Sequence, residues 1–227
     1  MKTLQILQQE IVQCRKCTRL VSHRENIARR KRRQYMDWTY WGRPVPSFGD
    51  PEARLLIIGL APAAHGGNRT GRIFTGDRSG DWLFQILYES GFANQPTSTH
   101  CGDGLVLKDC YITAIIHCAP PDNKPARDEI LDCQSYLIEE IKMLRQVRVV
   151  VTLGRIAFDN YLETCRLLGW PRPTPRPAFG HGKVYVLNHG VTLISSYHPS
   201  QQNTLTGKLT RQMLHGVFIK ARSILYQ

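Results

Sequence analysis

Short apolar runs alternate with longer amphipathic segments along the 227-residue chain. The runs at 55–59, 111–116 and 147–153 are rich in leucine, isoleucine and valine, the pattern of parallel strands buried on both faces. A fourth run, 191–195, follows 183–187 across a short turn, which predicts a hairpin. The pattern therefore predicts an α/β fold, a three-layer α/β/α sandwich around a central, mainly parallel four-stranded sheet.

The helical layers are predicted from apolar residues that recur every three or four positions. We expect helices over 3–13, 81–88, 126–144, 155–167 and 207–226. Residues 18–50 are basic with interleaved aromatic residues, and we expect an irregular arm there. Since no internal repeat or linker stands out, we expect residues 1–227 to form one domain.

The formal charge of +12, from 30 Lys and Arg against 18 Asp and Glu, indicates an anionic partner such as nucleic acid. Arg24 and the five basic residues of 29–33 lie within ten positions, a clustering that solubility alone does not require. No run of about 20 apolar residues occurs, so we expect no membrane-spanning helix. The first residues lack the apolar core of a signal peptide, and we expect a cytoplasmic protein.

Seven cysteines, an odd number, favour metal binding or free thiols over a disulfide framework. Cys14 and Cys17 form a C-x-x-C pair, whose spacing lets two thiolates bind one metal site. Cys118 and Cys133 lie far downstream, and the structural alternative is that all four are ordinary core residues. We expect free thiols at Cys101, Cys110 and Cys165.

A long loop at 59–77 follows the first predicted strand and leads to the helix expected at 81–88. In open α/β sheets, loops at the carboxyl ends of strands bind ligands. The five glycines of this loop let backbone N–H groups approach a ligand closely. Arg69 and Arg72 could reach phosphate groups, and Phe74 could stack on a flat ring. The structural alternative is a glycine-rich loop that only caps the sheet.

Two further loops are expected at the same edge of the sheet. Residues 117–125 follow the second strand and contain Asn123, whereas residues 196–204 follow the fourth strand and contain His198. Because the carboxyl ends of parallel strands share one edge, we expect both side chains near the 59–77 loop. Taken alone, His198 could be an ordinary hydrogen-bonded histidine and Asn123 a turn residue.

Several segments resemble a known family. Gly59-Leu-Ala-Pro-Ala63 and Asn68-Arg-Thr-Gly-Arg-Ile-Phe-Thr-Gly-Asp77 resemble motif 1 of the uracil-DNA glycosylase superfamily, in the form found in its family-5, or type-b, iron–sulfur members. His198-Pro-Ser-Gln-Gln-Asn-Thr204 resembles motif 2 of the same branch, and Cys118-Ala-Pro-Pro-Asp-Asn-Lys-Pro125 matches it as well. The resemblance covers most of the chain from Cys14 to Arg211.

This resemblance implies a monofunctional DNA glycosylase of base excision repair. It would flip uracil out of DNA and hydrolyse the glycosidic bond, leaving an abasic site. The family further implies a structural [4Fe–4S] cluster held by Cys14, Cys17, Cys118 and Cys133, with zinc as the chemical alternative. We expect a monomer with DNA as its partner and no membrane contact, associated with the nucleoid of a prokaryote when bound to DNA.

The resemblance also suggests roles for individual residues. Leu60, Ala61 and Ala63 offer no carboxylate, so water activation falls to Asp77 or Asn123, although Asp77 could only cap the following helix. His198 would donate a hydrogen bond to the departing uracil O2. Substrate binding is assigned to Gly59, Leu60, Ala61, Pro62, Ala63, Phe74 and Asn203, and DNA binding to Arg69, Arg72, Ser200, Gln201 and Gln202.

The superfamily's usual uracil reader, an asparagine in the second strand, is replaced here by the segment Ala114-Ile-Ile. We therefore expect hypoxanthine and other deaminated bases to be released too. The main alternative is a non-catalytic nucleic-acid-binding protein with a metal-stapled α/β core. A redox protein or nuclease is a weaker alternative, because the C-x-x-C lacks a flanking βαβ pattern. A relative that bonds covalently to its abasic product is also compatible with the sequence.

Overall fold

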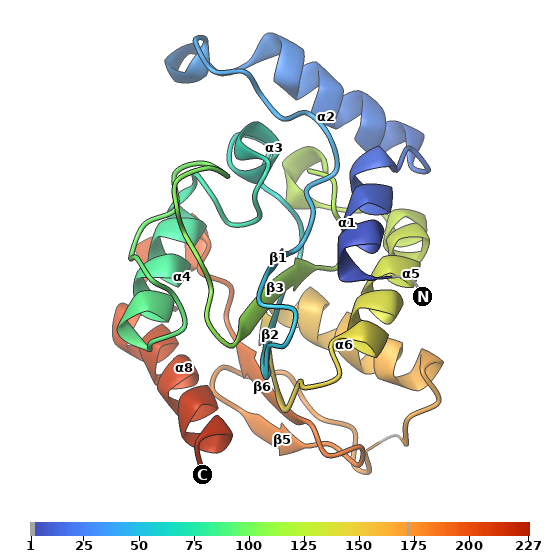
Figure 1. Ribbon diagram of the computed structural model, residues 1–227, viewed down its shortest axis with the longest axis vertical. Helices are drawn as coiled ribbons and strands as arrows, with labels where there is room; N and C mark the ends of the chain where they lie inside the picture. Colours follow the sequence, from blue (N-terminus) through green and yellow to red (C-terminus); the bar gives the residue numbers. More distant parts are fainter. Residues whose placement is uncertain (1–2, 172) are drawn as a thin grey trace.

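The computed structural model describes residues 3–171 and 173–227, and a six-stranded mixed sheet lies at its centre (Figure 1). The strands, in the spatial order β1-β3-β2-β4-β6-β5, are β1 (Phe48–Gly49), β3 (Cys110–Ala114), β2 (Leu55–Gly59), β4 (Val149–Leu153), β6 (Thr192–Ser196) and β5 (Val184–Val186). The inner four strands are parallel and entirely buried, as predicted.

The predicted count of four strands is wrong, because an antiparallel strand flanks the parallel sheet on each side. β5 comes from the predicted hairpin with β6, and its residues are partly exposed at the sheet edge. β1 contains only two residues in the turn-rich segment before β2, too few to leave a hydrophobic pattern.

Helices cover both faces of the sheet (Figure 1). They are α1 (Leu4–Gln13), α2 (Thr18–Arg30), α3 (Gly67–Thr70), α4 (Arg78–Glu89), α5 (Arg127–Met143), α6 (Arg155–Leu167), α7 (Gln201–Leu205) and α8 (Arg211–Leu225), with short 3-10 turns η1 (Arg33–Tyr35) and η2 (Pro121–Asn123). α4 and α8 pack on one face, and α1, α5 and α6 pack on the other. No helix in the described residues is long and apolar enough to cross a bilayer.

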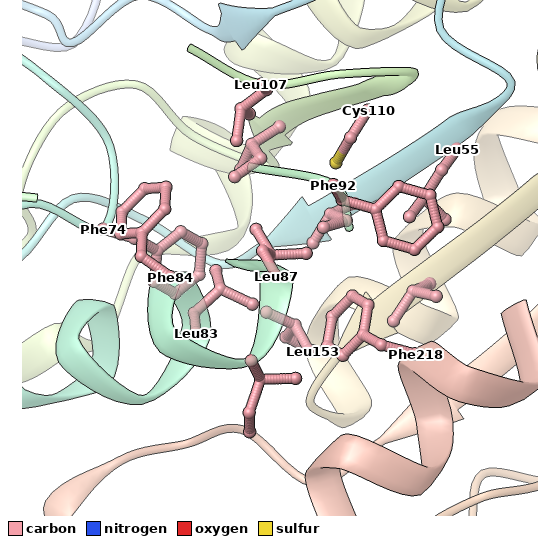
Figure 2. Packing of buried hydrophobic residues seen from close by; sticks show 14 of the residues in the cluster. Leu55, Phe74, Leu83, Phe84, Leu87, Phe92, Leu107, Cys110, Leu153 and Phe218 are labelled. Atoms are coloured by element: carbon pink, nitrogen blue, oxygen red, sulfur yellow. The ribbon is translucent and has the colours of Figure 1, made fainter. Parts of the chain in front are cut away.

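One face of the sheet carries a core of large aromatic and aliphatic side chains. Figure 2 shows Phe84 and Leu87 of α4 with Phe92 and with Phe218 of α8, packed over Leu55 of β2. Together these side chains hold α4 and α8 against the sheet, with the loop between β2 and α4 at the edge of the cluster.

α2 corrects the expected irregular arm at 18–50. Leu20, Val21 and Arg24 are buried on one side of this helix, and Ile27 continues the same side at helical spacing. Its remaining positions are mostly polar or basic, so the helical spacing of its few hydrophobic residues was not evident from the sequence. The segment therefore builds an ordered layer beside the carboxyl edge of the sheet (Figure 1).

The arrangement of crossovers creates a crevice at that edge. The chain leaves β2 through α4 to reach β3 on one side, and it leaves β4 through α6 to reach β6 on the other. The connections therefore diverge between β2 and β4. In open parallel sheets this divergence opens a crevice beyond the carboxyl ends of the strands, where ligands bind.

Candidate active site

A cleft of about 470 Å³ opens at the carboxyl ends of β2, β4 and β6. Its lining includes Leu60, Leu153, Gly154, Tyr197, His198 and Asn203. The cleft therefore joins segments that follow three different strands, including the predicted ligand loops at 59–77 and 196–204 but not the one at 117–125.

His198 stacks on Phe74 with 5.8 Å between ring centroids and 29° between planes. Phe74 is buried beside Phe84 at the end of the core cluster (Figure 2), and its backbone has a φ of +54°. A Cβ at Gly59 would lie only 2.7 Å from the Phe74 ring, so glycine is needed there for close approach. The aromatic ring thus forms a rigid backing for His198, in a backbone conformation that non-glycine residues rarely adopt.

Burial lowers the pKa of His198 to about 4. The imidazole is therefore neutral at physiological pH and can donate one hydrogen bond without carrying a charge. A neutral histidine facing a cleft is suited to stabilise a negative charge that develops on a bound group. The main chain beyond it is also fixed, because Asn203 Nδ2 donates to the His198 carbonyl at 2.8 Å.

The loop after β2 turns back on itself at Ala63, whose carbonyl accepts the N–H groups of Gly66 and Asn68 at 3.2 and 3.0 Å. Within residues 3–171 and 173–227, the N–H groups of Ala61 and Ala63 make no hydrogen bond. Pro62 between them is buried. This short stretch thus offers unused backbone donors next to Leu60, which lines the cleft.

Asp77 caps the N-terminus of α4, where its Oδ1 accepts the Gly80 N–H at 3.0 Å. Its second carboxylate oxygen faces Gly66, where an added Cβ would overlap it. Burial raises the pKa of Asp77, while the hydrogen bonds from the Gly80 and Ser79 backbone oppose that shift. The capping role foreseen from the sequence is therefore present, and water activation by Asp77 stays a prediction.

Asn123 is exposed on η2 with a φ of +56°, next to Asp122 at +52°. Asparagine and aspartate tolerate this left-handed conformation better than other non-glycine residues. In the described part of the chain, no hydrogen bond connects the Asn123 side chain to the cleft. The turn role accounts for its conformation, and its catalytic role also stays a prediction.

Arg69 is buried, with 4% of its surface exposed. Its guanidinium donates to the His65 carbonyl at 2.8 Å and to the Gly76 carbonyl at 3.0 Å. The rings of Tyr35 and Trp38 lie 3.9 and 4.1 Å from it. This corrects the predicted DNA-binding role, because the side chain is fully engaged in fastening the loop and η1 together.

Arg72 is likewise 4% exposed and enclosed by the connection between α4 and β3. It forms an ion pair with Asp103 at 2.5 Å and hydrogen bonds with Ser98 and Thr75 at 2.7 and 3.1 Å. The predicted contact of Arg72 with DNA phosphate is corrected in the same way, since this arginine ties the ligand loop to residues 91–109.

The segment after His198, which was expected as a loop, contains the short helix α7. Ser200 caps it by accepting the Asn203 N–H at 3.4 Å. Gln201 and Gln202 occupy its first turn and are exposed beside the cleft. The structure therefore places their side chains where an external ligand can reach them.

The sequence reasoning missed the part of the cleft formed by the start of α6. Gly154 begins that helix with a φ of +99°, and no side chain caps it. Arg155 and Lys208 also line the cleft, and Lys208 Nζ lies 5.0 Å from the centre of the Tyr197 ring. A glycine directly after the apolar run 147–153, followed by arginine, was the available signal.

The four predicted metal-binding cysteines meet in one region from distant parts of the chain. Cys14 and Cys17 lie between α1 and α2, Cys118 follows β3, and Cys133 lies on α5. Burial, together with the nearby Cys118, Cys17 and Cys14, raises the pKa of Cys133 to about 12. In the described residues, however, no three His, Cys, Asp or Glu side chains are arranged to hold a metal ion.

The surroundings of these cysteines nevertheless suit an anionic group. Arg24, which is 2% exposed, donates to Cys118 Sγ at 2.9 Å, while its buried Nε has no partner in the described chain. Four thiols that share one region are a donor set for zinc or an iron–sulfur cluster, and the buried cation beside Cys118 suits the negative charge of such a group. The residues present therefore fit the implied group.

Known proteins are similar in sequence to this chain over most of its length. The family model for the uracil DNA glycosylase superfamily matches residues 46–221. The chain is 49% identical to a type-5 uracil-DNA glycosylase of Mycobacterium tuberculosis over 93% of this chain and 78% of that protein. Its identity to the type-5 enzyme of Thermus thermophilus is 48% over 95% of both chains, and to that of Pyrobaculum aerophilum 46% over 93% and 88%.

Proposed function

The chain belongs to the uracil-DNA glycosylase superfamily, and from this premise we propose that it removes uracil from DNA by hydrolysing the N-glycosidic bond. This is the opening reaction of base excision repair. The observation that carries the proposal is the cleft in which Leu60 of the first motif faces His198 and Asn203 of the second. We further propose that residues 1–227 act as one monomeric domain in the cytoplasm, at the nucleoid.

Uracil must leave the DNA stack before the enzyme can reach its glycosidic bond. The unused N–H groups of Ala61 and Ala63 would bind the carbonyl oxygens of the flipped base, and Leu60 would contact its face. Phe74 would contribute stacking from behind Gly59. Asn203 would hold the main chain of His198 in place, as it does in the free protein.

Cleavage of the bond leaves negative charge on the departing uracil. His198 would donate a hydrogen bond to O2 from its neutral ring, which is an electrostatic contribution of about 10²–10³ in rate. The neutral form is the one that burial maintains. A water must then attack C1′, and we assign its orientation to Asp77 or Asn123, the polar candidates on the neighbouring loops.

The DNA backbone would cross the mouth of the cleft. Arg155 and Lys208, together with the uncapped start of α6, are placed to contact phosphates beside the flipped nucleotide. Gln201 and Gln202 would fill part of the gap that the flipped base leaves, and Ser200 would keep their helix in place. We expect no lysine nucleophile, so the product is an intact strand with an abasic site.

We propose a [4Fe–4S] cluster held by Cys14, Cys17, Cys118 and Cys133, with zinc as the alternative. When bound, it would supply metal–thiolate bonds that join these distant segments, and it would supply no step of base removal. Arg24 provides a buried positive charge beside Cys118, as such an anionic group requires.

Base selectivity should be broad. Ala114 ends β3 with a buried methyl side chain, so this strand presents no amide at the position of the superfamily's usual uracil reader. A pocket rejects a wrong base when that base leaves polar groups of the protein without a hydrogen-bond partner. We therefore propose that hypoxanthine and other deaminated bases are released as well.

The test is a cleavage assay on a labelled duplex with one uracil opposite guanine, with alkali added only after the reaction. Cleavage that depends on alkali and falls about 10²-fold or more in His198→Ala is expected. His100→Ala, which changes an exposed histidine away from the cleft, serves as the control. A folded wild-type protein that binds this duplex without releasing uracil would instead support the non-catalytic binder.

A further inference from the structure

Arg24 is a buried cation without a carboxylate partner of its own. The side chain lies on α2 with 2% of its surface exposed. Glu25 approaches it only to 3.9 Å and already pairs with Arg15 at 2.6 Å. A buried, unpaired charge is costly, so the environment of Arg24 must supply negative charge from another source.

The groups around the guanidinium identify that source. Arg24 Nη1 donates to Cys118 Sγ at 2.9 Å, and both Nη atoms lie 3.4 Å from the Cys14 carbonyl. The Nε atom is buried and has no partner among the described residues. Arg24 thus contacts two of the four proposed metal ligands, Cys118 and Cys14, and its Nε–H remains an unused donor.

We propose that Arg24 is the counter-cation of the metal–thiolate group assigned to the four cysteines, and that it determines how firmly this group is held and how readily it is reduced. Four thiolate ligands outweigh the positive charge of a zinc ion or an oxidised [4Fe–4S] core, which leaves the group anionic. The inference rests on the proposed metal site and not on uracil chemistry.

The same residue connects the metal region to the base-binding loop. The Arg24 carbonyl accepts a hydrogen bond from Asn68 Nδ2 at 3.2 Å, and the same Asn68 nitrogen lies 3.4 Å from the Ala64 carbonyl. The guanidinium thus faces the cysteines, while the backbone of Arg24 holds the loop. Arg24 is therefore a positioning residue for the metal group, and its effect on activity would be indirect.

The experiment uses the metal-bound protein as purified, without DNA. Arg24→Met, Arg24→Lys and the wild type are mixed with excess EDTA, and metal loss is followed by absorbance near 400 nm and by metal analysis. We expect Arg24→Met to lose metal about 10–100-fold faster than the wild type. Arg24→Lys should lie between them, because it keeps the charge but not the planar fork. For an iron–sulfur group, the reduction potential of Arg24→Met should also be lower.

Arg30→Met is the matched control, since it removes an exposed positive charge from the last turn of the same helix. Metal loss from Arg24→Met at the wild-type or Arg30→Met rate would overturn the proposal, as would a wild-type protein that carries no metal. If Arg24→Met does not fold, Arg24→Lys decides the question by losing metal faster than Arg30→Met. Uracil release, measured separately on the wild type, tests the glycosylase proposal on its own.

Discussion

His198 lies partly buried on the cleft wall and stacks on Phe74, and its burial has a consequence for pH. Because burial lowers its pKa to about 4, the neutral donor persists over the physiological range. We therefore expect His198 to add no step to the pH profile of single-turnover uracil release between about pH 8 and about pH 5, where its charge does not change. A step with a midpoint near 6.5, the ordinary histidine value, that is also present in Asp77→Asn would contradict this assignment.

The same shift links His198 to stability. Between about pH 6.5 and 4 the unfolded chain binds a proton at this position and the folded chain does not, so stability decreases as the pH falls through that window. His198→Phe should lack this part of the pH dependence. Urea unfolding of both proteins at pH 7.5 and 4.5 measures it, and equal losses in the two would show that another group is responsible.

Asp77 has two possible roles that one pair of variants separates. Asn is as good a helix cap as Asp but cannot act as a base. Asp77→Asn should therefore keep the stability of α4 and lower the rate of uracil release about 10²-fold or more, whereas Asp77→Ala should also lose about 1 kcal/mol. Asp81→Asn, on the exposed first turn of the same helix, is the control. A wild-type rate in Asp77→Asn would leave Asp77 with the cap alone and assign the water to Asn123.

For single residues, the sequence predicts which chemistry a side chain can perform better than it predicts whether that side chain is buried. The predicted position of His198 agrees with the cleft, because a histidine after a buried strand must lie at the sheet edge, whereas its role stays a prediction. Arg69 and Arg72 were assigned to DNA because arginines in a glycine-rich loop resemble a phosphate site. Their burial depends on Tyr35, Trp38 and Asp103, which come from other segments, and no local pattern reveals those contacts.

Among the elements, the loop between β2 and α4 depends on the Arg72–Asp103 pair. Arg72 and neighbouring backbone N–H groups lower the pKa of Asp103 despite its burial, so this carboxylate contributes stability above about pH 4 that is lost on further acidification. Arg72→Met should cost about 3–5 kcal/mol, because it leaves a buried carboxylate unpaired. Urea unfolding at pH 7 measures this cost.

The control for this prediction is Arg166→Met, which breaks an exposed pair with Glu163 on α6. That change should stay within about 0.5–1 kcal/mol. The stability of Arg72→Met should also depend less on pH than that of the wild type below about pH 4, since its Asp103 no longer has a lowered pKa. Equal costs for the two arginine variants would mean that Arg72 does not hold the loop.

The elements that the sequence predicted are those with a strong hydrophobic period. The four parallel strands and the helix at 155–167 agree closely with β2, β3, β4, β6 and α6. α2 was missed because a buried arginine occupies one of its inward positions and most of its other residues are polar. The spacing of hydrophobic residues cannot predict that an arginine faces the core. The burial of Arg24 depends on its contacts with Cys118 and Cys14 from other parts of the chain.

For the molecule as a whole, the proposed metal group at the four cysteines would connect the N-terminal helices to α5 across more than half of the chain. Cys133→Ser should therefore lose the bound metal and its colour and melt at a lower temperature. Uracil release per folded molecule should change little, since no cysteine of this set lines the cleft. Cys101→Ser, at an exposed thiol, should retain metal. A fully metal-bound Cys133→Ser would contradict the proposed ligand set.

The charge of +12 acts over the whole molecule and should appear as salt dependence. Each phosphate neutralised on duplex DNA contributes a slope of about −0.9 to the logarithm of affinity against the logarithm of salt. Arg155 and Lys208 line the cleft, so replacing both by methionine should reduce the magnitude of that slope by about 1.8. DNA binding measured from about 50 to about 300 mM salt gives the slope directly.

A salt effect on binding must be separated from one on chemistry. At saturating enzyme the single-turnover rate should change little with salt, because His198 and the backbone donors of the loop act inside the cleft, where screening is weak. Lys142→Met serves as the control, since this exposed lysine lies near the end of α5, at the opposite edge of the sheet. If Lys142→Met reduces the magnitude of the salt slope as much as Arg155→Met or Lys208→Met does, the positive charge acts only as a diffuse field.

A larger reduction in Arg155→Met and Lys208→Met would instead mean that these two cations contact phosphates. Such contacts would orient the strand so that a flipped base meets Leu60 and His198.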